Sequence, residues 1–363
     1  MTMDRLRMRV ECVLRAARRI QDPADELGLE ARKRLPESTG LSKESIELAL
    51  QDHFETRPSE AEIDALLEST GRADVCHVIL SANVFTASLR AIVLAVATAP
   101  RVVVRRSRRD SVIAELLIRS LAHEARFGDF EGEVAFTDEI APEPGHELHV
   151  YGSDETISTI MANLPAGVLV RAHGTGLGIA IIGDNDDFGL AAEALARDIG
   201  VFDQRGCLSP RFVFVEGDEA WARKCCEKLN ESMTRFAFRV PRGELDEELR
   251  ADVARYQATV EAIGTYWDGF AHGIGFDPEP RALVLPPAAR IVHVVGVDEA
   301  RARALLEPWK RYVTAVGANA ETGLAGALKE WLPQARWSRL GNMQRPLLDG
   351  PVDGRTGVER VAR

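Results

Sequence analysis

The sequence lacks the features that would assign its 363 residues to several large classes of protein. It has no uninterrupted run of 18 apolar residues, so no membrane-spanning helix is expected. Its first residues are amphipathic and rich in arginine, without the apolar core of a signal peptide, and the protein is expected to be cytoplasmic. Positive charge is in deficit, with 45 lysines and arginines against 56 acidic residues, for a net charge of -11. This balance argues against nucleic acid or an anionic membrane as the main partner.

Cysteine is scarce, and its spacing argues against two further classes. The chain has five cysteines, at positions 12, 76, 207, 225 and 226. An odd number that includes an adjacent pair favours reduced thiols in a reducing compartment over a disulfide framework. None of the spacings is typical of a zinc site, so no metal is expected.

The composition that remains, 45% hydrophobic and 28% charged, is that of a globular protein long enough for two domains. The first 70 residues have helical periodicity, with a turn predicted over residues 35–42. From residue 74, short apolar segments alternate with helices; strands are predicted at 75–80, 102–104, 149–151, 168–170, 179–182 and 212–215. This alternation is typical of a doubly wound α/β sheet that binds a nucleotide at its strand ends. No Gly-x-Gly-x-x-Gly follows the first strand, so the nucleotide site has to be of a variant kind.

Cys207 stands in a turn of small and polar residues, Phe-Asp-Gln-Arg-Gly-Cys-Leu-Ser-Pro over residues 202–210, between a helical segment and a strand. A thiol held by such a turn can present its sulfur to a cleft. Taken alone, a single cysteine is more often a small buried hydrophobe than a nucleophile.

Several segments, in this order along the chain, resemble the aldehyde dehydrogenase superfamily. They are Val-Ile-Leu-Ser-Ala-Asn-Val-Phe at 78–85, Arg-Val-Val-Val-Arg-Arg-Ser at 101–107, Tyr-Gly-Ser at 151–153, His-Gly-Thr-Gly-Leu-Gly at 173–178, and the Cys207 turn. Residues 35–42, 149–156, 202–210 and 340–346 more closely resemble the bacterial bioluminescence-type fatty-acid (acyl-CoA) reductases. The resemblance implies an aldehyde dehydrogenase-like α/β fold with a variant doubly wound nucleotide-binding domain and a second α/β catalytic domain. The expected division is 1–172, 173–340 and a tail at 341–363.

The resemblance implies catalytic roles for three residues. Cys207 is expected to attack a carbonyl carbon as a thiolate, with Arg205 or a nearby helix N-terminus lowering its pKa. Asn83 occupies the place of the amide that stabilises the oxyanion, although an asparagine that bonds its own turn is the commoner use. His173, 34 positions before the cysteine, stands where hydrolytic members have a glutamate. It is expected to move a proton at the thiol or the alkoxide; the alternative is a loop histidine bonded to backbone.

The resemblance also implies a nicotinamide cofactor. Arg105 occupies the position of a lysine that contacts the adenine ribose, and Arg106, Arg108 and Arg109 add charge beside it. Because a guanidinium can grip a 2′-phosphate with two hydrogen bonds, NADP is favoured over NAD, unless the arginines form only a solvated turn. Gly152 and Ser153 match a helix start that meets the pyrophosphate, but an ordinary helix cap has the same residues.

The function implied is NADPH-dependent reduction of a (fatty) acyl-CoA or acyl thioester to an aldehyde through an acyl-cysteine intermediate. The alternatives are an oxidative aldehyde dehydrogenase and a catalytically silent member that binds a partner. The expected partners are an acyl-CoA or acyl-protein thioester, an acyl-transfer or acyl-activating subunit, and further copies of the chain. An aromatic cluster at residues 264–270 is expected either to border an acyl tunnel or to pack in the core.

Overall fold

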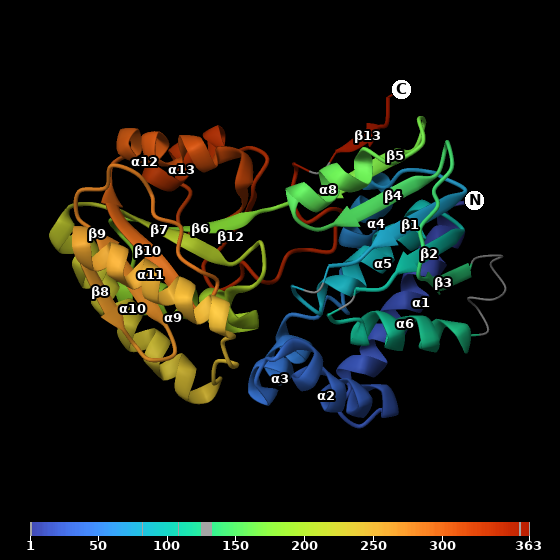
Figure 1. Ribbon diagram of the computed structural model, residues 1–363, viewed down its shortest axis with the longest axis horizontal. Coiled ribbons are helices and arrows are strands. Elements are labelled where there is room, and N and C mark those ends of the chain that lie inside the picture. The colour runs from blue at the N-terminus through green and yellow to red at the C-terminus, as the bar shows by residue number, and fades with distance from the viewer. Residues whose placement is uncertain (1, 82, 108, 125–132, 356, 363) are drawn as a thin grey trace.

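The computed structural model describes residues 2–81, 83–107, 109–124, 133–355 and 357–362. Its strands form two separate sheets that are both largely parallel, and helices pack against each sheet (Figure 1). Across the described residues, every helix is too short or too polar to span a bilayer. The fold is of the mixed α/β class that the alternation of strands and helices predicted.

Four helices precede the first strand: α1 (Met3–Gln21), α2 (Glu26–Thr39), α3 (Lys43–Asp52) and α4 (Glu60–Ser69). The turn predicted over residues 35–42 is wrong in its first half, because α2 continues through Pro36 and ends where Gly40 adopts a φ of 68°. Ser42 then accepts a hydrogen bond from the Ser45 amide and begins α3. Helix α3 packs against the residues that precede Cys207, so the N-terminal helices support the turn that carries the cysteine.

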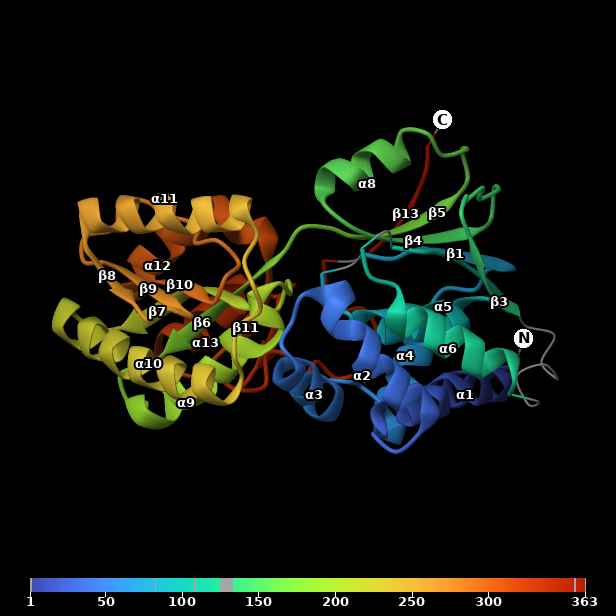
Figure 2. The ribbon, with the colours of Figure 1, turned by 60° about the horizontal axis from the view of Figure 1, so that its bottom comes forward.

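The first sheet has the strand order β13-β5-β4-β1-β2-β3, and all neighbours are parallel except β13 with β5. Its strands are β1 (Val75–Ile79), β2 (Arg101–Arg105), β3 (Glu133–Thr137), β4 (Glu147–Tyr151), β5 (Leu169–His173) and β13 (Val358–Arg360). Helices α5 (Ala87–Thr98) and α6 (Val112–Ala122) cover one face together with α1 and α4, and α8 (Asp154–Met161) covers the other (Figure 2). Because the strands are parallel, β1, β2, β4 and β5 all end at one edge, which faces the second sheet in Figure 2.

The second sheet has the order β12-β11-β6-β7-β10-β9-β8, with only β8 and β9 antiparallel. Its strands are β6 (Leu177–Ile182), β7 (Pro210–Glu216), β8 (Thr265–Asp268), β9 (Gly273–Asp277), β10 (Ile291–Val297), β11 (Val313–Gly317) and β12 (Arg336–Ser338). Helices α9 (Phe188–Gly200) and α10 (Glu219–Arg239) pack on one face. The other face is covered by α11 (Glu247–Ile263), α12 (Glu299–Leu306), the 3-10 helix η2 (Glu307–Tyr312) and α13 (Gly323–Trp331).

Two connections join the sheets, and both pass the carboxyl edge of the first one. Residues 174–176 link β5 directly to β6. After β12, residues 339–355 run back from the second sheet toward β13, which adds an edge strand to the first sheet (Figure 1). Residues 282–285, which precede β10, have no regular structure. The division into three regions stays a prediction.

Candidate active site

The turn before Cys207 has an unusual backbone. Three successive non-glycine residues, Phe202, Asp203 and Gln204, have positive φ angles of 54°, 50° and 66°. Each such residue costs on the order of 1–3 kcal/mol and persists only where surrounding contacts impose it. They form the 3-10 segment η1 (Val201–Gln204), which ends three residues before Cys207. A backbone fixed in this way gives the cysteine a defined position.

The contacts that impose this backbone come from the second sheet. Arg290, fully buried, donates to the Asp203 carboxylate over 2.8 Å, and the Gly243 amide donates to the other oxygen over 2.9 Å. The Gln204 side chain accepts from the Ile291 amide over 2.8 Å and donates to the Ile291 carbonyl over 2.7 Å. Two buried side chains of the turn are therefore bonded to residues at the start of β10 and to the loop between α10 and α11.

Cys207 lines a cavity of about 300 Å³ between the two sheets. The same cavity is lined by Asn83, His173, Gly152 and Ser153, which come from the connections and strand ends of the first sheet. All three expected catalytic residues and the expected pyrophosphate site thus lie around one space. Their chemical roles stay predictions.

Asn83 and Cys207 lie on segments that touch. A Cβ atom built on Gly206 would stand 3.2 Å from Cγ2 of Val84. Since Val84 follows Asn83 and Gly206 precedes Cys207, the loop after β1 packs directly against the cysteine turn. Asn83 itself is exposed, so its side-chain amide is accessible to a ligand.

His173 is the last residue of β5 rather than part of a loop. Its ring stacks on Tyr151 of β4, with centroids 4.0 Å apart and planes 5° from parallel. Nε2 of His173 is buried and has no hydrogen-bond partner. Burial lowers the pKa of this imidazole well below 6.5, so it is neutral at pH 7, and its unbonded Nε2 is a weaker proton acceptor than that of a free histidine.

The prediction that the Cys207 thiol has a low pKa is wrong. Burial raises the pKa of this thiol to about 11, and the nearby Asp353 carboxylate adds to the rise. Arg205 instead donates to the carbonyl of Thr39, and the strand β7, not a helix, follows the turn. The thiol is therefore protonated at rest, and a proton acceptor has to act before it can attack.

This raised pKa predicts slow alkylation of the free protein. Because the thiolate fraction below the pKa grows tenfold per pH unit, the rate of Cys207 modification by iodoacetamide should rise about tenfold per unit between pH 7 and 9. Peptide mass spectrometry after timed quenching measures this rate, and the four other cysteines, all buried, serve as internal controls. A rate that is already constant above pH 7 would show an ionised thiol and contradict the assignment.

Arg105 and Arg106 do not line the cavity. Arg105 ends β2, and the Arg106 guanidinium lies 4.5 Å above the Phe136 ring with half of its side chain exposed. Arg109 is also exposed, while Arg108 lies outside the described residues. Because β2 neighbours β1 in a parallel sheet, Arg105 and Arg106 lie along the same carboxyl edge as the cavity.

Gly152 and Ser153 serve two purposes at the start of α8. The Ser153 hydroxyl accepts from the Thr156 amide over 3.2 Å, which is the ordinary helix cap considered from the sequence. Both residues also line the cavity, so the cap does not exclude a ligand there.

Several cavity residues were not identified from the sequence. Glu55 follows α3 and pairs over 3.0 Å with Arg90 of α5. The segment that returns to the first sheet forms a further wall; its lining residues are Gln344, Pro346, Val352, Asp353 and Arg355. Arg90 donates to three carbonyls of this segment, at residues 346, 347 and 350. Of these residues, only Gln344 and Pro346 lie in a segment that carried the family resemblance, residues 340–346.

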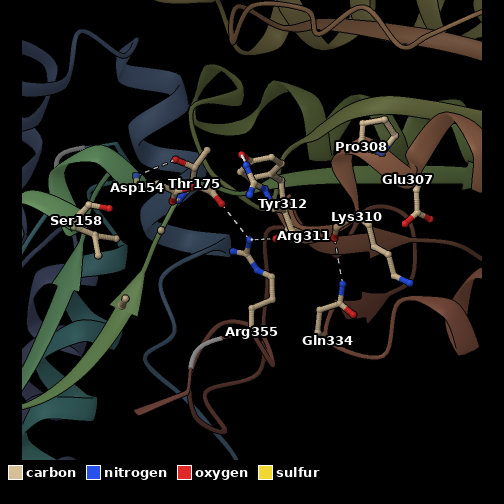
Figure 3. Close-up of a pocket in the computed structure, with 13 residues that line it drawn as sticks. Asp154, Ser158, Thr175, Glu307, Pro308, Lys310, Arg311, Tyr312, Gln334 and Arg355 are labelled. Atoms are coloured by element: carbon tan, nitrogen blue, oxygen red, sulfur yellow. Dashed lines mark hydrogen bonds between the residues drawn. The ribbon is translucent and has the colours of Figure 1, made fainter. Parts of the chain in front are cut away.

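A second, more open hollow of about 760 Å³ adjoins the cavity and shares Gly174, Thr175 and Arg355 with it. Figure 3 shows that it lies between the start of α8 and η2. The Arg355 guanidinium spans the gap, donating to the carbonyls of Thr175 and Arg311 over 3.1 and 3.0 Å. The hollow and the Cys207 cavity are therefore neighbours separated by these shared residues.

The comparison with protein families decides the identity of the fold and the activity. The family described as acyl-CoA reductase (LuxC) matches residues 43–363, most of the chain. The chain belongs to this family. It is an oxidoreductase that acts on acyl-CoA and aldehyde groups. A search of curated proteins finds no match.

Solved structures similar to this acyl-CoA reductase have the aldehyde dehydrogenase fold. They include an oxidoreductase from Marinobacter aquaeolei, with a TM-score of 0.68 and 10% identity over 99% of this chain and 85% of that one. An NAD-dependent benzaldehyde dehydrogenase from Corynebacterium glutamicum has a TM-score of 0.67 and 14% identity over 98% and 83% of the two chains. Aldehyde dehydrogenase 21 from Physcomitrella patens has a TM-score of 0.67 and 10% identity over 99% and 82%. At these identities the likeness shows the fold alone, and it confirms the fold expected from the sequence.

Proposed function

We propose that this acyl-CoA reductase transfers an acyl group from CoA, or from another thioester, to Cys207 and releases it as an aldehyde at the expense of NADPH. The observation that carries the proposal is the shared cavity of Cys207, Asn83 and His173. A nucleophile, an amide donor and a neutral imidazole are the groups that acyl transfer requires.

In the first half-reaction, the sulfur of Cys207 bonds to the thioester carbon and the bond from that carbon to the CoA sulfur breaks. The thiol proton passes to the neutral imidazole of His173, which returns it to the departing CoA thiolate. The Asn83 amide and the backbone N–H of Cys207 donate to the oxygen as negative charge develops on it. One such donor is worth roughly 10²- to 10³-fold in rate.

The residues around the cavity suit a nicotinamide cofactor. Gly152 has no close neighbour on its Cα side, because a Cβ built on it would contact only Thr156, at 3.6 Å, so a pyrophosphate can approach the start of α8. Arg105 and Arg106 lie farther along the same edge, where they would hold the 2′-phosphate of NADPH. When bound, the cofactor supplies the hydride that reduces the acyl carbon.

In the second half-reaction Cys207 is the leaving group: its bond to the acyl carbon would break as the bound cofactor supplied the hydride, and the aldehyde would leave. Asn83 again stabilises the oxygen anion before the carbonyl re-forms. The thiolate that is released takes one proton, so each turnover consumes a proton, and the raised pKa of Cys207 favours this return to the thiol.

The oxidative alternative requires a carboxylate that activates water. Within the described lining of the cavity the carboxylates are Glu55 and Asp353, and each is paired with an arginine: Arg90 at 3.0 Å and Arg355 at 3.0 Å. A carboxylate held by a guanidinium in this way is less available to orient a water. This pairing, with histidine at position 173, supports reduction over hydrolysis of the acyl-enzyme.

The direct test is to incubate the protein with isotope-labelled acyl-CoA and to search for a thioester on Cys207 by peptide mass spectrometry. NADPH oxidation that depends on acyl-CoA would exclude the catalytically silent alternative. A protein that forms no adduct at Cys207 with any acyl-CoA would overturn the proposal.

Replacing Arg105 with alanine should raise the KM for NADPH about 10- to 100-fold and leave the KM for NADH unchanged. The expected loss is that of a charge-assisted hydrogen bond to the 2′-phosphate, about 1.5–3 kcal/mol. Initial rates with both cofactors measure it, and Arg101→Ala, at the exposed start of the same strand, is a matched control. Equal losses with NADPH and NADH would contradict a contact with the 2′-phosphate.

A further inference from the structure

A row of polar side chains runs along one face of the first sheet and ends at the Cys207 cavity. We propose that two of them, Glu147 and His149, form a proton relay that supplies, through His173, the proton that each turnover consumes. This inference rests on the proposed function and adds to it the source of that proton.

The row occupies neighbouring positions on two parallel strands. Residues 147, 149 and 151 of β4 pair with residues 169, 171 and 173 of β5. Alternate residues of a strand point to the same face of the sheet. Glu147, His149 and Tyr151 therefore share one face with Arg171 and His173.

The same strands are apolar on their other face, which packs on α8. Parallel strands that are buried on both faces are usually apolar throughout. The polar row is therefore an exception, and it lies on the face turned away from α8 (Figure 2). The apolar face holds Leu148, Val150, Val168 and Val170.

The polar row is deeply buried. Glu147, His149 and Arg171 are 1%, 0% and 5% exposed. Ionisable groups are costly to bury, so a strand under selection for stability alone would carry aliphatic side chains here. Contacts within the row offset part of this cost. Nε2 of His149 lies 2.9 Å from Oε1 of Glu147, and Nε of Arg171 lies 3.5 Å from the same oxygen.

At one end the row reaches the Cys207 cavity. Tyr151 and His173 line this cavity, and the centroid of the His149 ring lies 6.3 Å from that of His173. Nδ1 of His149 and Nε2 of His173 are both buried, and neither makes a hydrogen bond within the described part of the chain. The rings are too far apart for a direct hydrogen bond, so the proton passes between them through one bridging water molecule.

At the other end the row comes close to the surface. Gly71 lies against Glu147, because a Cβ built on this glycine would stand 2.3 Å from Oε2 of the carboxylate. That oxygen is buried without a hydrogen bond to any described residue, and the next residue along the chain, Arg72, is exposed. Glycine at position 71 therefore leaves room for a carboxylate near the surface, where it can take a proton from water.

An imidazole suits the middle of such a path, because it can accept a proton at one nitrogen and release one from the other. Burial lowers the pKa of His149 below its ordinary value, although Glu147 opposes the shift, so the ring is neutral at pH 7. In the relay step, Nδ1 of His149 gives a proton toward His173 while Nε2 takes one from the Glu147 carboxyl group. Water then returns one proton to the carboxylate, and the imidazole reorients.

The two half-reactions differ in their need for this proton. Acylation moves the thiol proton of Cys207 through His173 to the departing CoA, so it takes up none from outside. Release of the aldehyde leaves a thiolate, and burial raises the pKa of this thiol to about 11, so the sulfur takes up a proton. The relay therefore serves the second half-reaction and is not needed for the first.

The test compares His149→Gln with the unaltered protein, using decanoyl-CoA and NADPH. The glutamine amide can still donate to Glu147, but it cannot pass a proton on. Acylation of Cys207 without NADPH, followed by quenched-flow mass spectrometry, should stay within about twofold, whereas steady-state NADPH oxidation should fall at least about tenfold. Added imidazole, which carries protons through solution, should restore part of the lost rate in the variant and leave the unaltered protein unchanged.

His293→Gln is the matched control. His293 is also fully buried, in β10, with Nδ1 2.9 Å from the Tyr256 hydroxyl and Nε2 unbonded among the described residues. It does not line the cavity, so its replacement should change neither rate. If circular dichroism shows that His149→Gln does not fold, Glu147→Gln takes its place and should show the same difference between acylation and turnover.

The outcomes separate a relay from general support of the fold. Equal losses of acylation and turnover would assign the pair a structural role and overturn the inference. Unchanged turnover, or a loss that imidazole does not repair, would overturn it as well. Failure of the unaltered protein to acylate Cys207 overturns the proposed function itself, and it is recognised because it occurs without any substitution.

Discussion

Replacing Cys207 with serine is expected to abolish acylation and to lower acyl-CoA-dependent NADPH oxidation by more than about 10³-fold. A serine hydroxyl ionises far less readily than a thiol, and the neutral His173 is too weak a base to compensate. The fold should survive, because the turn is fixed by Asp203 and Gln204 and not by the cysteine side chain. Mass spectrometry with labelled acyl-CoA and a coupled NADPH assay measure the two losses.

A matched control is Cys225→Ser, which alters a buried thiol in α10, on a face of the second sheet that contributes nothing to the cavity lining. This variant should retain acylation and turnover even where its stability falls. Turnover that persists unchanged in the Cys207 variant would remove the cysteine from the mechanism. The catalytically silent alternative would be favoured instead if the unaltered protein itself failed to oxidise NADPH.

The edge of the first sheet where the site lies could be predicted from the sequence, because the signals for it come from short segments of the chain. Asn83 and Gly152 follow segments with clear strand patterns, and the carboxyl ends of parallel strands meet at one edge. Cys207 was singled out by its turn between a helix and a strand, with the resemblance adding its role. These inferences needed only periodicity and the spacing of motifs along the chain.

The remaining walls of the cavity could not be predicted, because they are made by contacts between distant segments. Glu55 meets Arg90 across 35 positions, and Arg90 reaches the carbonyl of Gly350 across 260. Neither pairing leaves a periodic pattern. The same holds for the pKa of Cys207, which is set by burial between two sheets and by Asp353 rather than by the adjacent Arg205.

The backbone of the cysteine turn was also beyond sequence reasoning. Phe202, Asp203 and Gln204 carry no glycine signal, yet all three adopt positive φ angles. Local propensity argues against this conformation, so it is imposed by the buried bonds to Arg290 and Ile291. Sequence rules are expected to fail at functional sites, because an unfavourable backbone can be retained there next to a reactive residue.

Arg290→Met is expected to lower the free energy of unfolding by about 3–5 kcal/mol, because it leaves the Asp203 carboxylate buried without its partner. Arg290 also donates to the carbonyl of Val240 over 2.7 Å, a bond that is lost as well. Urea unfolding monitored by circular dichroism measures the change. The matched control is Arg235→Met, whose pair with Glu193 is more than half exposed on both sides and should cost less than about 1 kcal/mol.

The double variant Asp203→Asn with Arg290→Met distinguishes loss of a charge partner from loss of the turn. Removing both charges should recover part of the stability, since a buried pair replaced by uncharged groups is often nearly neutral. Acylation of Cys207 should nevertheless be slower than in the unaltered protein, because the asparagine and methionine no longer impose positive φ angles on the turn. Recovery of acylation together with stability would show that the ion pair supports only the fold, and that the cysteine keeps its position without it.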